Sequence, residues 1–256
     1  MNAFIYCFSS EWLKKKHSAA AWLTLAGGLF VPLILLFARL NNKKELYASH
    51  TSGQLWKTLY TTGWQYMGIL LLPLGVILVT SLFIQVEFKN NTWKQLHTTP
   101  KSFTALFFAK LAVILVMLLQ CLLLFNVGML LCGMVPAWIY VQIPLPKESF
   151  PLLMYVKGSL LFLMASLPVL ALQFLLGLLT KNFLVPLGVG MALYVAGIIG
   201  VKWQYGYIIP YGYGALLFAR KPGVDTTILI TSWAVGYSIV FIAAAYLLYL
   251  TKRDKA

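Results

Sequence analysis

Long apolar runs separated by short polar connections organise this chain. A helix needs about 20 apolar residues to cross the hydrocarbon layer of a membrane. Six runs approach that length, at about residues 21–38, 67–86, 105–132, 152–179, 184–201 and 227–250. They are too long and too uniformly apolar for the alternating strands of a membrane barrel. The pattern predicts an all-α polytopic membrane protein, with six transmembrane helices in a single domain over residues 1–256.

Three segments outside these runs have a character of their own. Residues 2–17 place Phe4, Ile5, Phe8, Trp12 and Leu13 at helical spacing before three lysines, which predicts an interfacial amphipathic helix. The polar stretch Leu40–Tyr66 is expected to form a small extracytoplasmic excursion. The aromatic, glycine-rich stretch 203–218 is long for a simple loop and is a candidate for a segment that re-enters the membrane from the outer side.

Composition agrees with the membrane class. The chain is 61% hydrophobic and 10% charged, with a mean hydropathy of +0.82, whereas a soluble domain carries about 25% charged residues. The net charge of +14 is spread over the connections between apolar runs. Lysine and arginine in that position set topology and bind anionic lipid headgroups. We therefore expect membrane lipids, and not nucleic acid, as partners of the basic residues.

Six spans place both termini on the same side of the membrane. Lysine and arginine near the span ends number eleven on that side and nine on the other. This margin is thin, but Lys14, Lys15 and Lys16 lie directly before the first span, which usually dominates orientation. Both termini are predicted to be cytoplasmic.

The sequence offers little for catalysis. It has no glycine-rich phosphate loop, its six acidic residues are spread along the chain, and its three histidines lie in connections away from any carboxylate cluster. Its three cysteines predict neither a disulfide framework nor a metal site. We expect no enzymatic activity, no bound metal and no cofactor on this chain.

Polar residues deep in the spans are few. Asn126 and Gln173 either line a substrate path or make interhelical hydrogen bonds. The absence of ionisable residues at depth disfavours a carrier driven by an ion gradient. Four glycines give the fifth run a small face that predicts a helix-packing interface: Gly188, Gly190, Gly197 and Gly200.

The stretch between the second and third runs, QVEFKNNTWKQLHTTPKSFTALFFAK, is polar and basic and contains a single acid, Glu87. A short helix here would present Trp93 and Leu96 to a pocket on a soluble partner. Lys94 and Lys101 would then meet acidic groups on that partner. This stretch is the predicted docking site.

These residues resemble the permeases of ABC-2-type transporters. The resemblance lies in an N-terminal amphipathic helix, six spans and a loop after the second span with an acid, a threonine, a Thr-Pro pair and a lysine at the next span. The matching residues are Glu11-Trp12-Leu13-Lys14, Glu87, Thr92, Thr99-Pro100 and Lys110. Trp93 and the short chain are similar to the lantibiotic and bacteriocin immunity branch. The chain departs from the family pattern at Asn90-Asn91, where the family usually has a glycine.

The resemblance implies partners and a site. Such a permease pairs with a second copy or a sister permease and docks on cytoplasmic ABC ATPase subunits, which hold the ATP and Mg²⁺. Contact runs through the cytoplasmic coupling helix within residues 87–104, with Glu87, Thr92, Trp93, Lys94, Leu96, Thr99, Pro100 and Lys101 as its residues. The implied setting is the bacterial inner membrane, and the implied task is export of an amphipathic peptide or lipid-like molecule. A membrane scaffold that recruits a soluble protein, and a secondary carrier, remain as alternatives.

Overall fold

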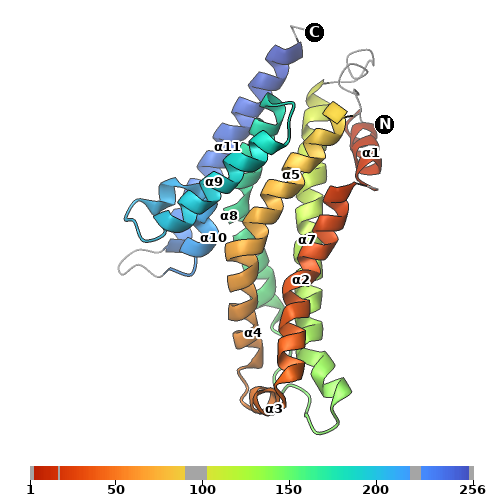
Figure 1. Cartoon of the computed structure of the whole chain (residues 1–256), viewed down its shortest axis with the longest axis vertical. Helices are drawn as coiled ribbons and strands as arrows, with labels where there is room; N and C mark the ends of the chain where they lie inside the picture. Colours follow the sequence, from red (N-terminus) through yellow and green to blue (C-terminus); the bar gives the residue numbers. More distant parts are fainter. Residues whose placement is uncertain (1–2, 17, 90–102, 220–225, 254–256) are drawn as a thin grey trace.

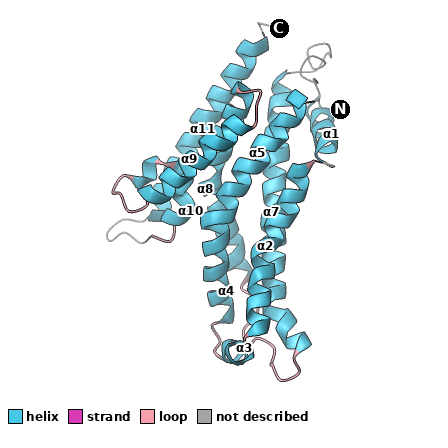
Figure 2. Cartoon of the chain, viewed as in Figure 1, coloured by secondary structure: helices cyan, strands magenta, loops and turns pink. Residues whose placement is uncertain are grey.

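The computed structural model describes residues 3–16, 18–89, 103–219 and 226–253, and only the backbone of residues 43, 44, 86–89, 252 and 253. All regular secondary structure in this part of the chain is helical (Figures 1 and 2). The elements are α1 (Ala3–Lys15), α2 (Ala19–Asn41), α3 (Lys43–Thr51), α4 (Leu55–Trp64), the π-helix η1 (Gln65–Leu71), α5 (Leu72–Lys89), α7 (Phe103–Ile139), α8 (Leu152–Leu179), α9 (Leu184–Gly200), the 3₁₀ turns η2 (Gly206–Ile208) and η3 (Pro210–Gly212), α10 (Tyr213–Leu216) and α11 (Thr226–Arg253).

Five helices are long and apolar enough to cross a membrane. They cover Ala19–Asn41, Leu55–Gln85, Phe103–Ile139, Leu152–Leu179 and Thr226–Thr251. The all-helical, multi-pass class predicted from the sequence is therefore confirmed. The predicted fifth span is the shorter apolar helix α9, whose 17 residues extend about 25 Å, less than the roughly 30 Å of a hydrocarbon core. A sixth crossing thus stays a prediction.

Two helices extend beyond the apolar runs that predicted the spans. The stretch Leu40–Tyr66 is not a separate excursion: it forms α3 and α4, and α4 runs on through η1 into α5. In α4, Leu55, Leu59 and Gly63 repeat every four residues and are buried, so the polar residues occupy only the opposite face. The third span likewise continues past residue 132 to Ile139, with Pro136 inside the helix.

At two of the prolines inside the long helices, a side chain from another helix takes up the backbone carbonyl that the proline frees. Proline has no N–H to donate four residues back. Pro73 thus leaves the carbonyl of Ile69 free, and the Tyr194 hydroxyl of α9 donates to it at 3.0 Å. Pro136 does the same to Cys132, whose carbonyl accepts from Arg39 Nη1 of α2 at 2.6 Å. These hydrogen bonds tie α9 to η1 and α2 to α7.

The end of the bundle that carries α3 is closed by a buried histidine. His50 is 1% exposed, and its Nδ1 lies 2.8 Å from the Pro144 carbonyl. Nδ1 must donate there, so neutral Nε2 accepts from Arg39 Nη2 at 2.9 Å. Burial first, and the Arg39 charge as a smaller cause, lower the pKa of His50 below its ordinary 6.5. The chain from residue 139 to 151 is thereby fixed to α2 and α3.

The segment 203–218 folds against the helices beside it. Tyr211 and Tyr213 are buried, and η3 packs closely on α9 where two glycines meet: a Cβ on Gly197 would stand 2.6 Å from the Gly212 nitrogen. The small face predicted on the fifth run is therefore a packing interface within the chain, and only Gly188 has open space around it. Re-entry of 203–218 into the membrane stays a prediction.

Both termini lie at the same end of the molecule, together with the end of α5 and the start of α7 (Figure 1). The α3 turn and the connection from α7 to α8 lie at the opposite end. The even number of crossings stays a prediction.

Gly197→Ala should destabilise the fold because its new methyl group meets backbone atoms that have no room to move. We expect a loss of about 1–3 kcal/mol, seen as a lower melting temperature of the protein in detergent. Gly188→Ala, in the same helix with open space around it, is the matched control and should be neutral or stabilising. Equal behaviour of the two variants would contradict the close approach of α9 and η3.

Acidification should destabilise the protein through His50. Its pKa is lowered in the folded state, so the unfolded chain binds the proton more readily as the pH falls below about 6.5, and stability declines across that window. We expect the melting temperature to fall between about pH 7.5 and pH 5.5, and to fall less in His50→Gln, which cannot be protonated. A fall of the same size in both proteins would assign the effect to other groups.

Candidate functional site

Most of the predicted docking segment lies outside the described residues. Glu87 belongs to the last turn of α5, and only its backbone is described. The other predicted residues (Thr92, Trp93, Lys94, Leu96, Thr99, Pro100 and Lys101) fall in the range 90–102, outside the described part of the chain. The predicted coupling helix is thus not tested, but the structure defines the frame that holds both ends of this segment.

Helix α1 forms one side of that frame. Cys7, Glu11 and Lys15, four residues apart, are its buried residues, and Cys7 packs with Leu106 and Ala109 of α7. Some bulky apolar residues face outward, since Phe4 is 41% exposed and Leu13 is 67% exposed. Phe8 and Trp12 instead pack against the core. The structure has a helix, Ala3–Lys15, over the predicted segment, and its amphipathic character as an interfacial helix stays a prediction. An outward apolar face is what an interfacial helix presents to lipid, although its place at the membrane surface remains a prediction.

Lys15 connects α1 to the interior of the bundle. Its side chain is only 7% exposed, and the ammonium group donates to Gln120 Oε1 of α7 at 2.8 Å. It also lies 3.8 Å from the centroid of the Trp12 ring, within range of a cation–π interaction. Burial lowers the pKa of Lys15 below its ordinary value. Sequence reasoning counted this lysine only as a topology signal, because its partner stands 105 positions away.

The start of α7 is also held by α11 and α8. Thr104 and the Tyr246 hydroxyl of α11 are 2.8 Å apart, and the Phe107 ring lies 5.2 Å from Tyr246 and 5.3 Å from Phe174 of α8. Lys110 is 2% exposed, with its ammonium 5.8 Å from the Tyr249 ring. A displacement of the segment before α7 would therefore act on three neighbouring helices.

Asn126 and Gln173 both make interhelical hydrogen bonds. Asn126 Nδ2 donates to Ser159 Oγ of α8 at 2.7 Å, and Gln173 Nε2 donates to the Tyr211 hydroxyl at 2.9 Å. Their side-chain oxygens are buried without a hydrogen-bond partner in the described structure. The structure thus shows the packing role of both residues, and their role in a substrate path remains a prediction.

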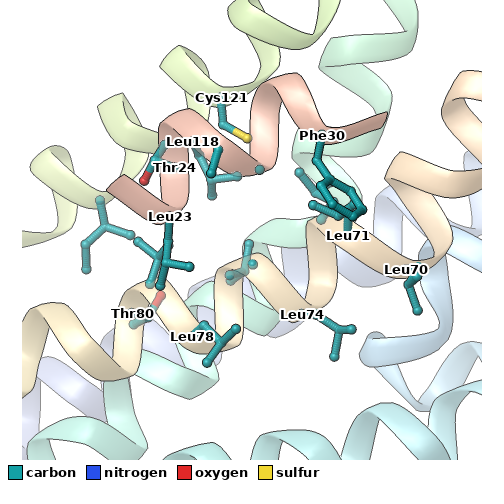
Figure 3. A pocket seen from close by; sticks show the side chains of 17 residues that line it. Leu23, Thr24, Phe30, Leu70, Leu71, Leu74, Leu78, Thr80, Leu118 and Cys121 are labelled. Carbon is teal, nitrogen blue, oxygen red and sulfur yellow. The ribbon is translucent and has the colours of Figure 1, made fainter. Parts of the chain in front are cut away.

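An apolar cavity of about 370 Å³ lies between α2 and α5, over α7. Figure 3 shows side chains from α2 and α5 pointing toward one another across it. Among the described residues no group of three or more metal-ligating side chains comes together.

A family model described as "ABC-2 family transporter protein" matches residues 7–197, from α1 through most of α9. The chain belongs to the ABC-2 transporter family. It is therefore a membrane-spanning permease component of an ABC transporter, and ABC-2 permeases normally work with ABC ATPase subunits. No curated protein and no solved structure matches the chain. The resemblance is confirmed at the level of the family, and the immunity branch remains a prediction.

Gln120→Leu should weaken the packing of α1 against α7. The change removes the side-chain acceptor of the buried Lys15 ammonium, and leaving a buried charged donor without a partner costs about 1–3 kcal/mol or more. We expect a lower melting temperature and faster proteolysis within α1. Adding Lys15→Met to the same protein should recover part of the loss, because no buried charge is then left. A double variant less stable than either single variant would show that the pair does not interact.

Proposed function

We propose that this permease forms the membrane path of an ATP-driven exporter energised by a separate ABC ATPase. Membership of the ABC-2 family carries the proposal. The cargo is an amphipathic peptide or a lipid-like molecule, as in antimicrobial-peptide immunity. The protein resides in the bacterial inner membrane with both termini in the cytoplasm, and ATP and Mg²⁺ bind to the partner ATPase.

The coupling site is residues 87–104. Support comes from the position of its two ends: α5 stops and α7 starts at the end of the molecule where both termini lie (Figure 1). The start of α7 contacts α1, α8 and α11. A push from the ATPase on this loop would then move packed helices as a unit, which is how rigid elements transmit a conformational change.

A second permease, identical or related, completes the membrane unit. Gly188 of α9 supports close contact with such a partner, since a Cβ there would meet nothing within 4 Å. Neighbouring residues on α9 are exposed and apolar, including Val185 and Val195. Small residues within an apolar helix face allow two membrane helices to approach closely.

The test is co-purification of the tagged permease in detergent with identification of bound proteins, followed by an ATPase assay. We expect an ABC ATPase to co-purify and to be lost in the double variant Trp93→Ala, Lys94→Glu. The matched control is Trp138→Ala, Lys147→Glu, which changes exposed residues of the same types at the opposite end of the bundle.

Three outcomes would oppose the proposal in different ways. A well-folded permease that co-purifies with no nucleotide-binding partner would contradict the exporter assignment. A soluble partner that lacks nucleotide-binding motifs would favour a scaffold. Substrate uptake driven by an ion gradient would favour a secondary carrier.

A further inference from the structure

The cavity between α2 and α5 is a groove with an apolar lining. Its floor is α7, and its two walls contain glycines at their centres. The floor consists of Ile114, Leu118 and Cys121, and the walls include Leu23, Gly27, Phe30, Leu71, Gly75 and Leu78. A Cβ on Gly75 would have no neighbour within 4 Å, so open space lies directly over this residue. The volume of about 370 Å³ falls within the range of about 300–1,000 Å³ typical of small-molecule sites.

The groove is open toward the surroundings of the bundle. Phe30 is 53% exposed, Leu70 is 48% exposed and Leu23 is 39% exposed, and all three line the cavity. They belong to the helices Ala19–Asn41 and Leu55–Gln85, both long and apolar enough to span the membrane. The molecules that reach this opening are therefore membrane components.

A buried hydroxyl group at one end of the groove has no partner. Thr80 is 0% exposed, and no residue of the described structure forms a hydrogen bond with its Oγ1. In Figure 3 the Thr80 side chain points toward Leu23 across the groove. Thr24, which also lines the cavity, already donates to the Ala20 carbonyl at 2.7 Å. A buried hydroxyl without a partner is costly, so the site fits a ligand that carries a hydrogen-bond acceptor at this end.

The same end of the groove lies toward the start of α2, whose residues Leu23 and Thr24 line it. Lys16 is exposed and stands three residues before Ala19, the first residue of α2. Ser18 caps that helix by accepting from the Ala21 N–H. The N-terminus of a helix and a lysine both favour an anionic group. From Thr80 to Leu70 the groove runs about 15 Å along α5.

We propose that this groove binds an anionic glycerophospholipid of the surrounding membrane. One acyl chain lies between α2 and α5, an ester carbonyl accepts a hydrogen bond from Thr80 Oγ1, and the phosphate lies near Lys16. A helix of a second permease chain is the competing occupant, and the experiments below distinguish it from a lipid. The site does not rest on the proposed ATPase partner, so its test can succeed or fail independently of the export function.

The first experiment uses the full chain in nanodiscs with phosphatidylglycerol that carries a photoreactive diazirine in one acyl chain. We expect mass spectrometry to find adducts concentrated on the groove-lining residues of α2 and α5. Gly75→Leu fills the groove and should abolish most of these adducts. Gly236→Leu in α11, where a Cβ also meets nothing within 4 Å, is the matched control and should keep them.

The second experiment tests the hydroxyl group. Thr80→Val keeps the shape of the side chain and should weaken binding of phosphatidylglycerol by about fivefold in native mass spectrometry. In lipid-free detergent the same variant should be no less stable than wild type, because no partner is lost. Ser81→Ala removes a buried hydroxyl that also lacks a partner but does not line the cavity, and it should leave lipid binding unchanged.

Replacement of phosphatidylglycerol by phosphatidylcholine tests the phosphate end of the site. Binding should weaken, and Lys16→Gln should reduce the difference between the two lipids. Adducts spread evenly over all lipid-facing helices, or unchanged in Gly75→Leu, would overturn the proposal in favour of ordinary boundary lipid. A photoreactive residue at position 30 that captures a second permease chain would overturn it in favour of a protein interface.

Discussion

The architecture depends on satisfying every backbone polar group away from water. A carbonyl freed by a proline inside an apolar bundle cannot accept a hydrogen bond from water. The carbonyls of Ile69 and Cys132 are both in this position, and the two side chains that reach them, Tyr194 and Arg39, come from other helices. A local interruption of one helix thus becomes a fixed contact between two. The contact made by Arg39 extends through His50 to the connection between α7 and α8.

Different interactions hold the two ends of the molecule. One end is held by hydrogen bonds between α2, α3 and the chain around Pro144. The other gathers α1 and α11 around the start of α7 through Lys15, Thr104 and the Phe107 ring. In the proposed function, the permease receives a push from the ATPase at this end and delivers it to the membrane path. A start of α7 that contacts three helices is a mechanical means of doing so.

The groove between α2 and α5 contains a buried hydroxyl group that lacks a hydrogen-bond partner in the described part of the chain. Asn126 and Gln173 find partners in neighbouring elements through their amide nitrogens. Thr80 faces a space lined by apolar side chains and has no partner among the described residues. A lipid ester would supply the missing acceptor, and its acyl chain would complete the packing of α2 against α5.

The sequence by itself determined the membrane class, the helical fold and the family, because long apolar runs and a scarcity of charge allow few other solutions. It also predicted the N-terminal helix. The helix of the second span starts earlier than the sequence predicted, because one face of α4 is polar and the opposite face is buried. Hydropathy averaged over the whole run hides that periodicity. Only the tertiary structure decided which partners Lys15, Arg39, His50 and Tyr194 have, since each pairing joins distant elements or depends on a carbonyl that a proline frees. It also decided that most of the glycine face of α9 packs against η3 and the neighbouring helices within the same chain. Spacing along one helix indicates that a face is small, but the neighbour that fills it is set by how the whole bundle packs.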